Sequence, residues 1–222
     1  MGRSKRVDIG NYVYHIINRA NARLPIFFEE KDYLLFEEIL REGVKKYEMR
    51  LLSYCLMPNH FHLVLYPKLE GDIQKFMQWV TLTHTQRWHS QNKTTGTGHL
   101  YQGRYKSFII QTDNHIYTVI RYVERNALRA KLVKKAENWR FSSLFWRFKN
   151  KTNSFLSDWP ISEPKDYLDF VNTPITNTEL DEIRESVHKG KPYGKNSWVD
   201  TKIKEFNLQA TIRSRGRPKK GT

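Results

Sequence analysis

The sequence predicts an α+β fold, in which one antiparallel sheet and several helices form a main domain and a small helical region follows it. Three observations support this. The first 112 residues alternate between strand-like and helix-like apolar spacing. Hydrophobic residues make up 39% of the 222 residues, which is enough for one sizeable core. From residue 149 the chain becomes polar and proline-punctuated. We therefore expect a domain at residues 1–150 and an accessory helical region at residues 151–222.

The predicted elements of the main domain follow one another as strand, helix, strand, strand, helix, strand. Strands are expected over residues 12–19, 49–57, 60–66 and 105–112, and helices over residues 31–48 and 72–89. Pro58 and Asn59 make a tight connection, so the second and third strands run antiparallel. Both helices carry an apolar stripe and must cover the same sheet face. This order is the split β-α-β pattern of ferredoxin-like folds.

Two histidines open the third predicted strand. Side chains alternate between faces along a strand, so His60 and His62 point one way and Phe61 and Leu63 the other. The apolar face packs on the core, while the other face offers two imidazoles to a common point. This is the geometry of half a metal site. For two histidines taken alone, a structural role is the alternative interpretation.

A third helix is expected over residues 115–130, where apolar residues recur at helical spacing. Tyr122 and Asn126 lie one turn apart and share a face. Presented to His60 and His62, a tyrosine nucleophile and an amide oxygen would make a compact phosphoryl-transfer site. In the alternative interpretation, Tyr122 packs between helices and Asn126 faces solvent.

The charge of the chain indicates its partner. Lys and Arg number 38 against 23 Asp and Glu, so the net charge is +15 and favours a polyanion. No run approaches the roughly 18 apolar residues of a spanning helix, and no signal peptide opens the sequence. The single cysteine, Cys55, excludes an internal disulfide and fits a reducing compartment. We expect nucleic acid as partner, no membrane, and a cytoplasmic, nucleoid-associated location.

At the two motif segments the chain resembles the HUH single-strand endonucleases, most closely the REP-associated branch of the single-tyrosine transposases. The resemblance runs from about residue 10 to the C-terminus and thins between residues 150 and 175. Its main segments are Pro58-Asn59-His60-Phe61-His62-Leu63-Val64 and residues 122–133, with further matches at His15-Ile16-Ile17-Asn18-Arg19, residues 98–107 and Arg215-Gly216-Arg217-Pro218.

This resemblance implies the ferredoxin-like fold and an active transposase. Such an enzyme cleaves and rejoins single-stranded DNA near hairpin, REP-like elements through a covalent 5′-phosphotyrosine, and leaves a free 3′-hydroxyl. Tyr122 would be the nucleophile, while His60, His62 and Asn126 would hold one divalent metal ion, Mg²⁺ or Mn²⁺. Tyr101 and Tyr117 are the other tyrosines near the motif. A monomer or a homodimer is expected.

Basic and polar residues at several places are expected to contact DNA. Arg104 and Lys106 lie two apart on a strand and share a face, which would let them follow phosphates, although surface solubility is the alternative. The Arg-Gly-Arg-Pro core of the tail resembles an AT-hook, and general phosphate binding by this tail is favoured over minor-groove recognition. The expected DNA contacts are Asn18, Arg19, Arg104, Lys106, Arg121, Arg125, Arg215, Arg217, Lys219 and Lys220.

The last part of the chain leaves alternatives open. The aromatic segment 139–146 is expected to pack under the nucleophile helix rather than stack on bases. Two short helices, opening near Thr176 and Ser197, would form either a small DNA-reading unit or a clasp on the main domain. Two other functions compete with the transposase: a non-catalytic nucleic-acid-binding module of ferredoxin-like fold, and a metal-dependent hydrolase without a covalent intermediate.

Overall fold

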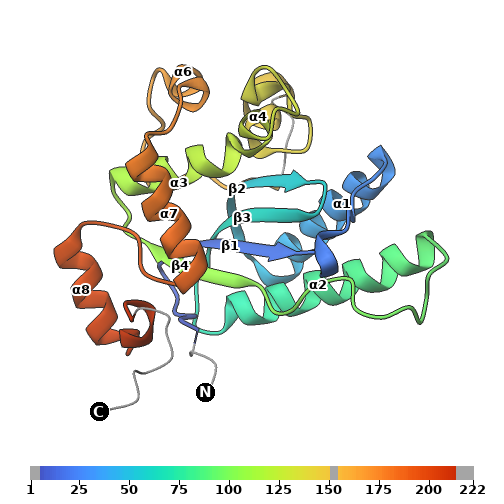
Figure 1. Cartoon of the computed structure of the whole chain (residues 1–222), viewed down its shortest axis with the longest axis horizontal. Helices are drawn as coiled ribbons and strands as arrows, with labels where there is room; N and C mark the ends of the chain where they lie inside the picture. The colour runs from blue at the N-terminus through green and yellow to red at the C-terminus, as the bar shows by residue number, and fades with distance from the viewer. Residues whose placement is uncertain (1–5, 151–154, 214–222) are drawn as a thin grey trace, which may run out of the picture.

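The computed structural model describes residues 6–150 and 155–213 of the chain. Its centre is a four-stranded antiparallel sheet with the strand order β2-β3-β1-β4 (Figure 1). The strands are β1 (Val13–Arg19), β2 (Arg50–Met57), β3 (His60–Tyr66) and β4 (Lys106–Ile110). The four predicted strands and the α+β, ferredoxin-like order are confirmed, although β4 is shorter than expected.

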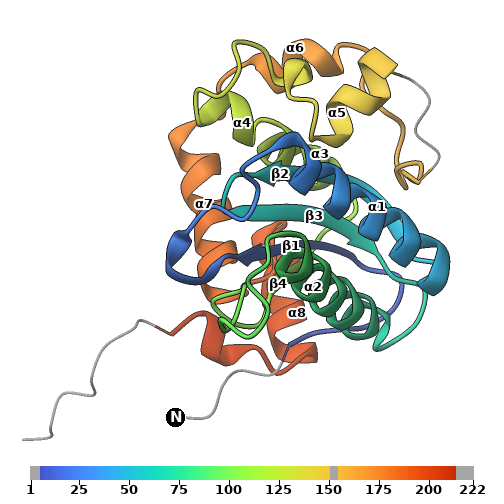
Figure 2. The ribbon, with the colours of Figure 1, turned by 90° about the vertical axis from the view of Figure 1, so that its right-hand side faces the viewer.

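One face of the sheet is covered by two long helices, as predicted. α1 (Glu30–Tyr47) and α2 (Asp72–Gln91) lie side by side on this face (Figure 2). They pack on the inward side chains of the strands, Phe61 and Leu63 among them. Gly43 permits the close approach of the helices, because a Cβ atom there would lie 3.0 Å from the ring of Phe76.

The opposite face carries α3 (Asn114–Glu124) and the short α4 (Asn126–Arg129). Apolar side chains of α3 form a second core with outward-facing strand residues such as Val64. The sequence predicted one continuous helix, but the structure divides it at Arg125. The side-chain amide of Asn126 donates to the carbonyls of Tyr122 and Val123, and such local bonding competes with the regular helix ladder.

The chain beyond α4 adds short elements. They are η2 (Ala136–Asn138), α5 (Ser143–Phe145), the π-helical turn η3 (Trp146–Asn150), α6 (Tyr167–Asn172), α7 (Asn177–Lys189), α8 (Asn196–Glu205) and η4 (Gln209–Thr211), while η1 (Asn21–Arg23) follows β1. The predicted capping box of Thr176 and Glu179 opens α7. α6 lies in the segment that was predicted to be a connection. It has six residues, too few to form a helix without tertiary packing.

The segment between α7 and α8 pairs with the free edge of β4. The Tyr193 N–H donates to the Ile109 carbonyl, and the Gln111 N–H donates to the Tyr193 carbonyl. Covering an edge in this way satisfies main-chain groups that would otherwise be open to another strand. The two helices therefore clasp the sheet, which is one of the two roles considered for them.

The aromatic segment packs inside the protein, as expected, but only part of it lies under α3. Phe141 stacks on Tyr33 of α1 with ring centroids 3.9 Å apart, and the Trp139 indole donates to the Leu56 carbonyl of β2. The segment thus packs against α1 and β2, and it also reaches α3, where Ser143 donates to Glu124 and Leu144 joins the core. In the described ranges, no helix is long and apolar enough to cross a membrane.

Candidate active site

The structure brings the two predicted histidines and the predicted tyrosine together on the α3 face of the sheet. His60 and His62 point to this face from β3, with ring centroids 5.1 Å apart. The ring of Tyr122, on α3, lies 5.6 Å from that of His62 and is nearly perpendicular to it. In the register of the sheet, His62 lies opposite Ile17 of β1 and Cys55 of β2, so β3, which carries both histidines, is paired on both sides.

A third histidine, which the sequence did not single out for a role, completes the cluster. His15 of β1 is fully buried, and its Nε2 lies 2.8 Å from Nδ1 of His62. Its ring is also 6.1 Å from that of Tyr122. Alternation along β1 was the available signal, because His15 shares a face with Ile17, the residue opposite His62.

The three imidazoles are neutral at ordinary pH. Burial lowers the pKa of His15 to about 3 and that of His60 to about 4. For His62, burial again is the main cause of a pKa well below the usual value, and the neighbouring His15 and His60 contribute. A neutral imidazole is the form that binds metal ions.

Hydrogen bonds at Nδ1 decide whether the other ring nitrogen, Nε2, of each predicted histidine ligand can bind a cation. Nδ1 of His60 lies 2.7 Å from Oδ1 of Asn59, an acceptor whose orientation is set because Nδ2 of Asn59 donates to the Arg23 carbonyl. Nδ1 of His60 is therefore the donor, and Nε2 keeps its lone pair. When Nδ1 of His62 donates to His15, Nε2 of His62 is likewise a ligand atom. Outer partners of this kind fix the tautomer of metal-binding histidines.

Asn126 is buried rather than facing solvent, being 1% exposed. Its Nδ2 donates to the Tyr122 carbonyl at 2.9 Å, so Oδ1 faces away from the helix axis and accepts from Arg129 at 2.5 Å. Two imidazole nitrogens and this amide oxygen fit a divalent cation. In the described part of the chain, no group of three or more His, Cys, Asp or Glu side chains is arranged to hold a metal ion.

Four of the predicted DNA contacts line a single cavity. Asn18 and Arg19 from the end of β1, with Arg104 and Lys106, surround a hollow of about 390 Å³. The charge of Arg19 also acts on both His60 and His62, lowering the pKa of each after the larger effect of burial. The cavity therefore lies next to the histidine pair.

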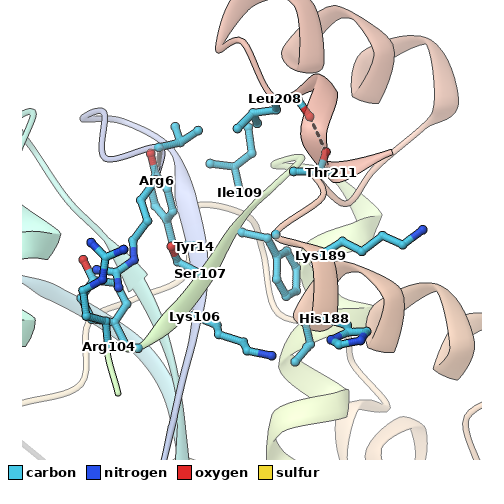
Figure 3. Close-up of a pocket in the computed structure, with 15 residues that line it drawn as sticks. Arg6, Tyr14, Arg104, Lys106, Ser107, Ile109, His188, Lys189, Leu208 and Thr211 are labelled. Atoms are coloured by element: carbon cyan, nitrogen blue, oxygen red, sulfur yellow. Dashed lines mark hydrogen bonds between the residues drawn. The ribbon is translucent and has the colours of Figure 1, made fainter. Parts of the chain in front are cut away.

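A neighbouring cavity of about 300 Å³ continues along the edge of β4. Figure 3 shows Lys106 extending from β4 toward His188 of α7, while Arg6 and Arg104 share the lining. No acidic residue is among its lining residues in the described part of the chain. The two cavities give the β4 edge a basic surface.

Arg121 and Arg125 lie elsewhere. The Arg121 guanidinium donates at 2.8 Å to the carbonyls of Thr173 and Pro174, and that of Arg125 donates to the carbonyls of Val171 and Asn172. The last carbonyls of a helix need such donors. These arginines therefore close the C-terminal end of α6, and we leave them out of the proposed DNA contacts.

The remaining predicted residues are also apart from the histidines or outside the described residues. The Tyr101 hydroxyl lies 2.5 Å from Nδ1 of His84 in the core on the other side of the sheet, and that of Tyr117 donates to the Ser162 carbonyl. Arg215, Arg217, Lys219 and Lys220 lie outside the described residues.

Comparison with known proteins agrees with this fold and gives the family of the chain. Residues 8–126, which include both β3 histidines, Tyr122 and Asn126, match the family model described as Transposase IS200 like. The chain belongs to the IS200-like transposase family. The motif resemblance to the single-tyrosine transposases is thereby confirmed.

One solved structure shares this fold, and a second is more weakly similar. The first is a REP-associated tyrosine transposase bound to a REP hairpin, with a TM-score of 0.57, 15% identity, and coverage of 79% of this chain and 96% of that one. The second is a candidate transposase from Deinococcus radiodurans R1, with a TM-score of 0.38, 17% identity, and coverage of 60% and 91%. No curated protein sequence matches this chain.

Proposed function

We propose that this protein is a single-strand DNA transposase that cleaves and rejoins DNA near hairpin elements through a covalent bond to Tyr122. The observation that carries the proposal is the position of Tyr122, a buried phenol 5.6 Å from the ring of His62 on a face that also holds His60. A tyrosine hydroxyl beside a pair of histidines is suited to nucleophilic attack on phosphorus. Membership of a transposase family supports the same activity.

In the proposed reaction the Tyr122 oxygen loses its proton and attacks the scissile phosphorus. The bond from phosphorus to the 3′ oxygen breaks, and that oxygen takes up a proton and leaves as a 3′-hydroxyl. The 5′ phosphate stays on Tyr122. One phosphodiester replaces another, so attack by a 3′-hydroxyl reverses the step without ATP. When bound, Mg²⁺ or Mn²⁺ would supply Lewis-acid charge to the non-bridging oxygens.

The chain's own residues position the reaction. His60, His62 and Asn126 would hold the divalent ion, and His15 keeps the His62 ring oriented. Asn126 also ties its side chain to the Tyr122 carbonyl, which couples the nucleophile to a proposed metal ligand. Positioning of this kind supplies much of the catalysis in phosphoryl transfer.

The proposed substrate is single-stranded or hairpin DNA. The net charge of +15 favours a polyanion, and the cavity lined by Asn18, Arg19, Arg104 and Lys106 includes the β1 residue, Arg19, that pairs with His60. A similar fold binds a REP hairpin in a REP-associated tyrosine transposase. Tail residues Arg215, Arg217, Lys219 and Lys220 are proposed to add phosphate contacts. The protein would act as a monomer or a homodimer.

A covalent adduct tests the proposal directly. The protein is incubated with Mn²⁺ and a pool of labelled single-stranded hairpin oligonucleotides, and adducts are resolved on a denaturing gel. We expect an adduct with the wild type and with Tyr117→Phe, a matched loss of one hydroxyl outside the site. Tyr122→Phe is expected to bind DNA but form none.

Three outcomes would contradict this. Adduct formation by Tyr122→Phe would move the nucleophile elsewhere. Free cleavage products without any adduct would indicate a hydrolase, and tight binding without cleavage would indicate a binding module.

A further inference from the structure

The oxygen proposed as the third metal ligand is already engaged by a positive side chain. Nη2 of Arg129 lies 2.5 Å from Oδ1 of Asn126. The carbonyls of Tyr122 and Val123 accept from the other atom of this amide, Nδ2, so the amide cannot turn over without losing both bonds. Arg129 therefore faces the same oxygen that a cation would use.

Arg129 also acts on the rest of the site. Its guanidinium carbon lies 5.3 Å from the centre of the Tyr122 ring. Its charge is among the causes, after burial, that lower the pKa of both His60 and His62. A cation held by these residues would thus meet the guanidinium at short range, where two positive charges in a partly buried site repel strongly.

Arg129 is able to leave this position. It is exposed at the end of α4, on a long side chain whose one described hydrogen bond is to Asn126. A guanidinium pairs well with phosphate because its N–H groups match two phosphate oxygens. A phosphate presented next to Tyr122 would lie beside Arg129.

We propose that Arg129 and a divalent cation exclude each other at Oδ1 of Asn126, and that the phosphate of bound DNA draws Arg129 away, so that DNA and the cation bind cooperatively. This inference rests on the proposed function and deepens it. It makes Arg129 both a restraint on cation binding and a ligand of the scissile phosphate. A site regulated in this way assembles fully only on substrate.

The first test uses Mn²⁺ alone, without DNA, in calorimetric titrations of the full-length protein. The variant Arg129→Met removes the positive charge and should tighten Mn²⁺ binding by roughly tenfold or more. Arg129→Lys keeps the charge and should bind as the wild type does. Lys134→Met removes an equal charge from an exposed residue just after α4 and should also leave Mn²⁺ affinity unchanged.

Each outcome of this test decides a different point. Equal Mn²⁺ affinity of the wild type and Arg129→Met overturns the inference and leaves the metal site intact. Equal gains in Arg129→Met and Arg129→Lys, or in Lys134→Met, overturn it as well, because exclusion by the Arg129 charge would then not be the cause. No Mn²⁺ binding by any of the proteins overturns the proposed metal site together with the inference.

The second test measures the link to DNA by repeating the Mn²⁺ titration with a saturating single-stranded hairpin oligonucleotide. Tyr122→Phe serves as the background, so that no cleavage occurs. DNA should raise Mn²⁺ affinity in Tyr122→Phe by roughly fivefold or more, and much less when Arg129→Met is added. A DNA effect of the same size in both proteins overturns the inference.

Discussion

At the scale of single residues, the site is defined by which atom of each polar side chain is already bonded. His60 and His62 each have Nδ1 engaged, by Asn59 and His15 respectively. Where Nδ1 is the donor, the opposite nitrogen, Nε2, is left for a ligand. Asn126 has its nitrogen committed to the helix and its oxygen bonded to Arg129. The hydrogen bonds that these side chains already make thus determine which of their atoms can bind a metal ion.

His15 provides the prediction at this scale. His15→Leu removes the partner of the His62 Nδ1 atom, so the His62 tautomer is no longer fixed and Mn²⁺ affinity should fall by roughly tenfold or more. His15→Gln restores an acceptor and should recover part of the affinity. Calorimetry with Mn²⁺ measures both variants. A His15→Leu protein with wild-type affinity and an unchanged melting temperature would remove His15 from the site.

At the scale of elements, the second face of the sheet is held by polar contacts that span long sequence distances. Glu124, fully buried on α3, accepts from the hydroxyls of Ser143 and Tyr167 at 2.6 and 2.7 Å. Arg121 of α3 and Arg125, at the junction of α3 and α4, donate to the segment at the end of α6. α3 therefore carries the nucleophile and also joins the later helices to the main domain.

The capping role of Arg125 is testable by stability. Arg125→Met leaves two main-chain carbonyls at the end of α6 without their donor, and we expect the free energy of unfolding to fall by about 1–3 kcal/mol. Arg184→Met is the control, because Arg184 makes an exposed ion pair with Asp181 within α7 and should cost at most about 0.5 kcal/mol. Urea unfolding provides both values.

DNA binding distinguishes this structural role from the contact that the sequence suggested. Folded Arg125→Met protein should bind hairpin DNA with the salt dependence of the wild type. A slope of log affinity on log salt that flattens by about 0.7, the contribution of one phosphate on a single strand, would return Arg125 to the DNA contacts.

At the scale of the whole molecule, buried neutral histidines make stability depend on pH. His84 is fully buried among Phe27, Phe36 and Tyr101, and burial lowers its pKa to about 3. Since this value lies below the 6.5 of the unfolded chain, its contribution to stability is present above pH 6.5 and is lost as pH falls toward 3. His15, His60 and His62 act in the same direction.

Acid sensitivity should therefore decrease when His84 is replaced. Below pH 6.5 each such histidine contributes a slope of up to about 1.4 kcal/mol per pH unit to the free energy of unfolding. His84→Phe keeps a ring in the core, and its unfolding free energy should change less steeply between pH 6.5 and 5 than that of the wild type. Parallel curves would show that His84 is charged in the folded protein.

The basic tail provides a second test at this scale. Removal of residues 214–222 deletes Arg215, Arg217, Lys219 and Lys220 but no residue of the histidine and tyrosine site. If the tail contacts two or three phosphates, the salt slope of DNA binding should flatten by roughly two units. Adduct formation at saturating DNA should change little. A slope equal to that of the full chain would show that the tail does not bind DNA.

The sequence by itself determined the order of strands and helices in the first 112 residues, the sheet face of His60 and His62, and the one-turn spacing of Tyr122 and Asn126. These features depend on spacing along one segment, because a strand repeats every two residues and a helix every 3.6. Only the tertiary structure placed His15 against His62, since the two are far apart in the chain and meet through strand register. It also turned Arg121 and Arg125 to the end of α6. Long, charged side chains have several partners within reach, and packing between distant segments decides which one they meet.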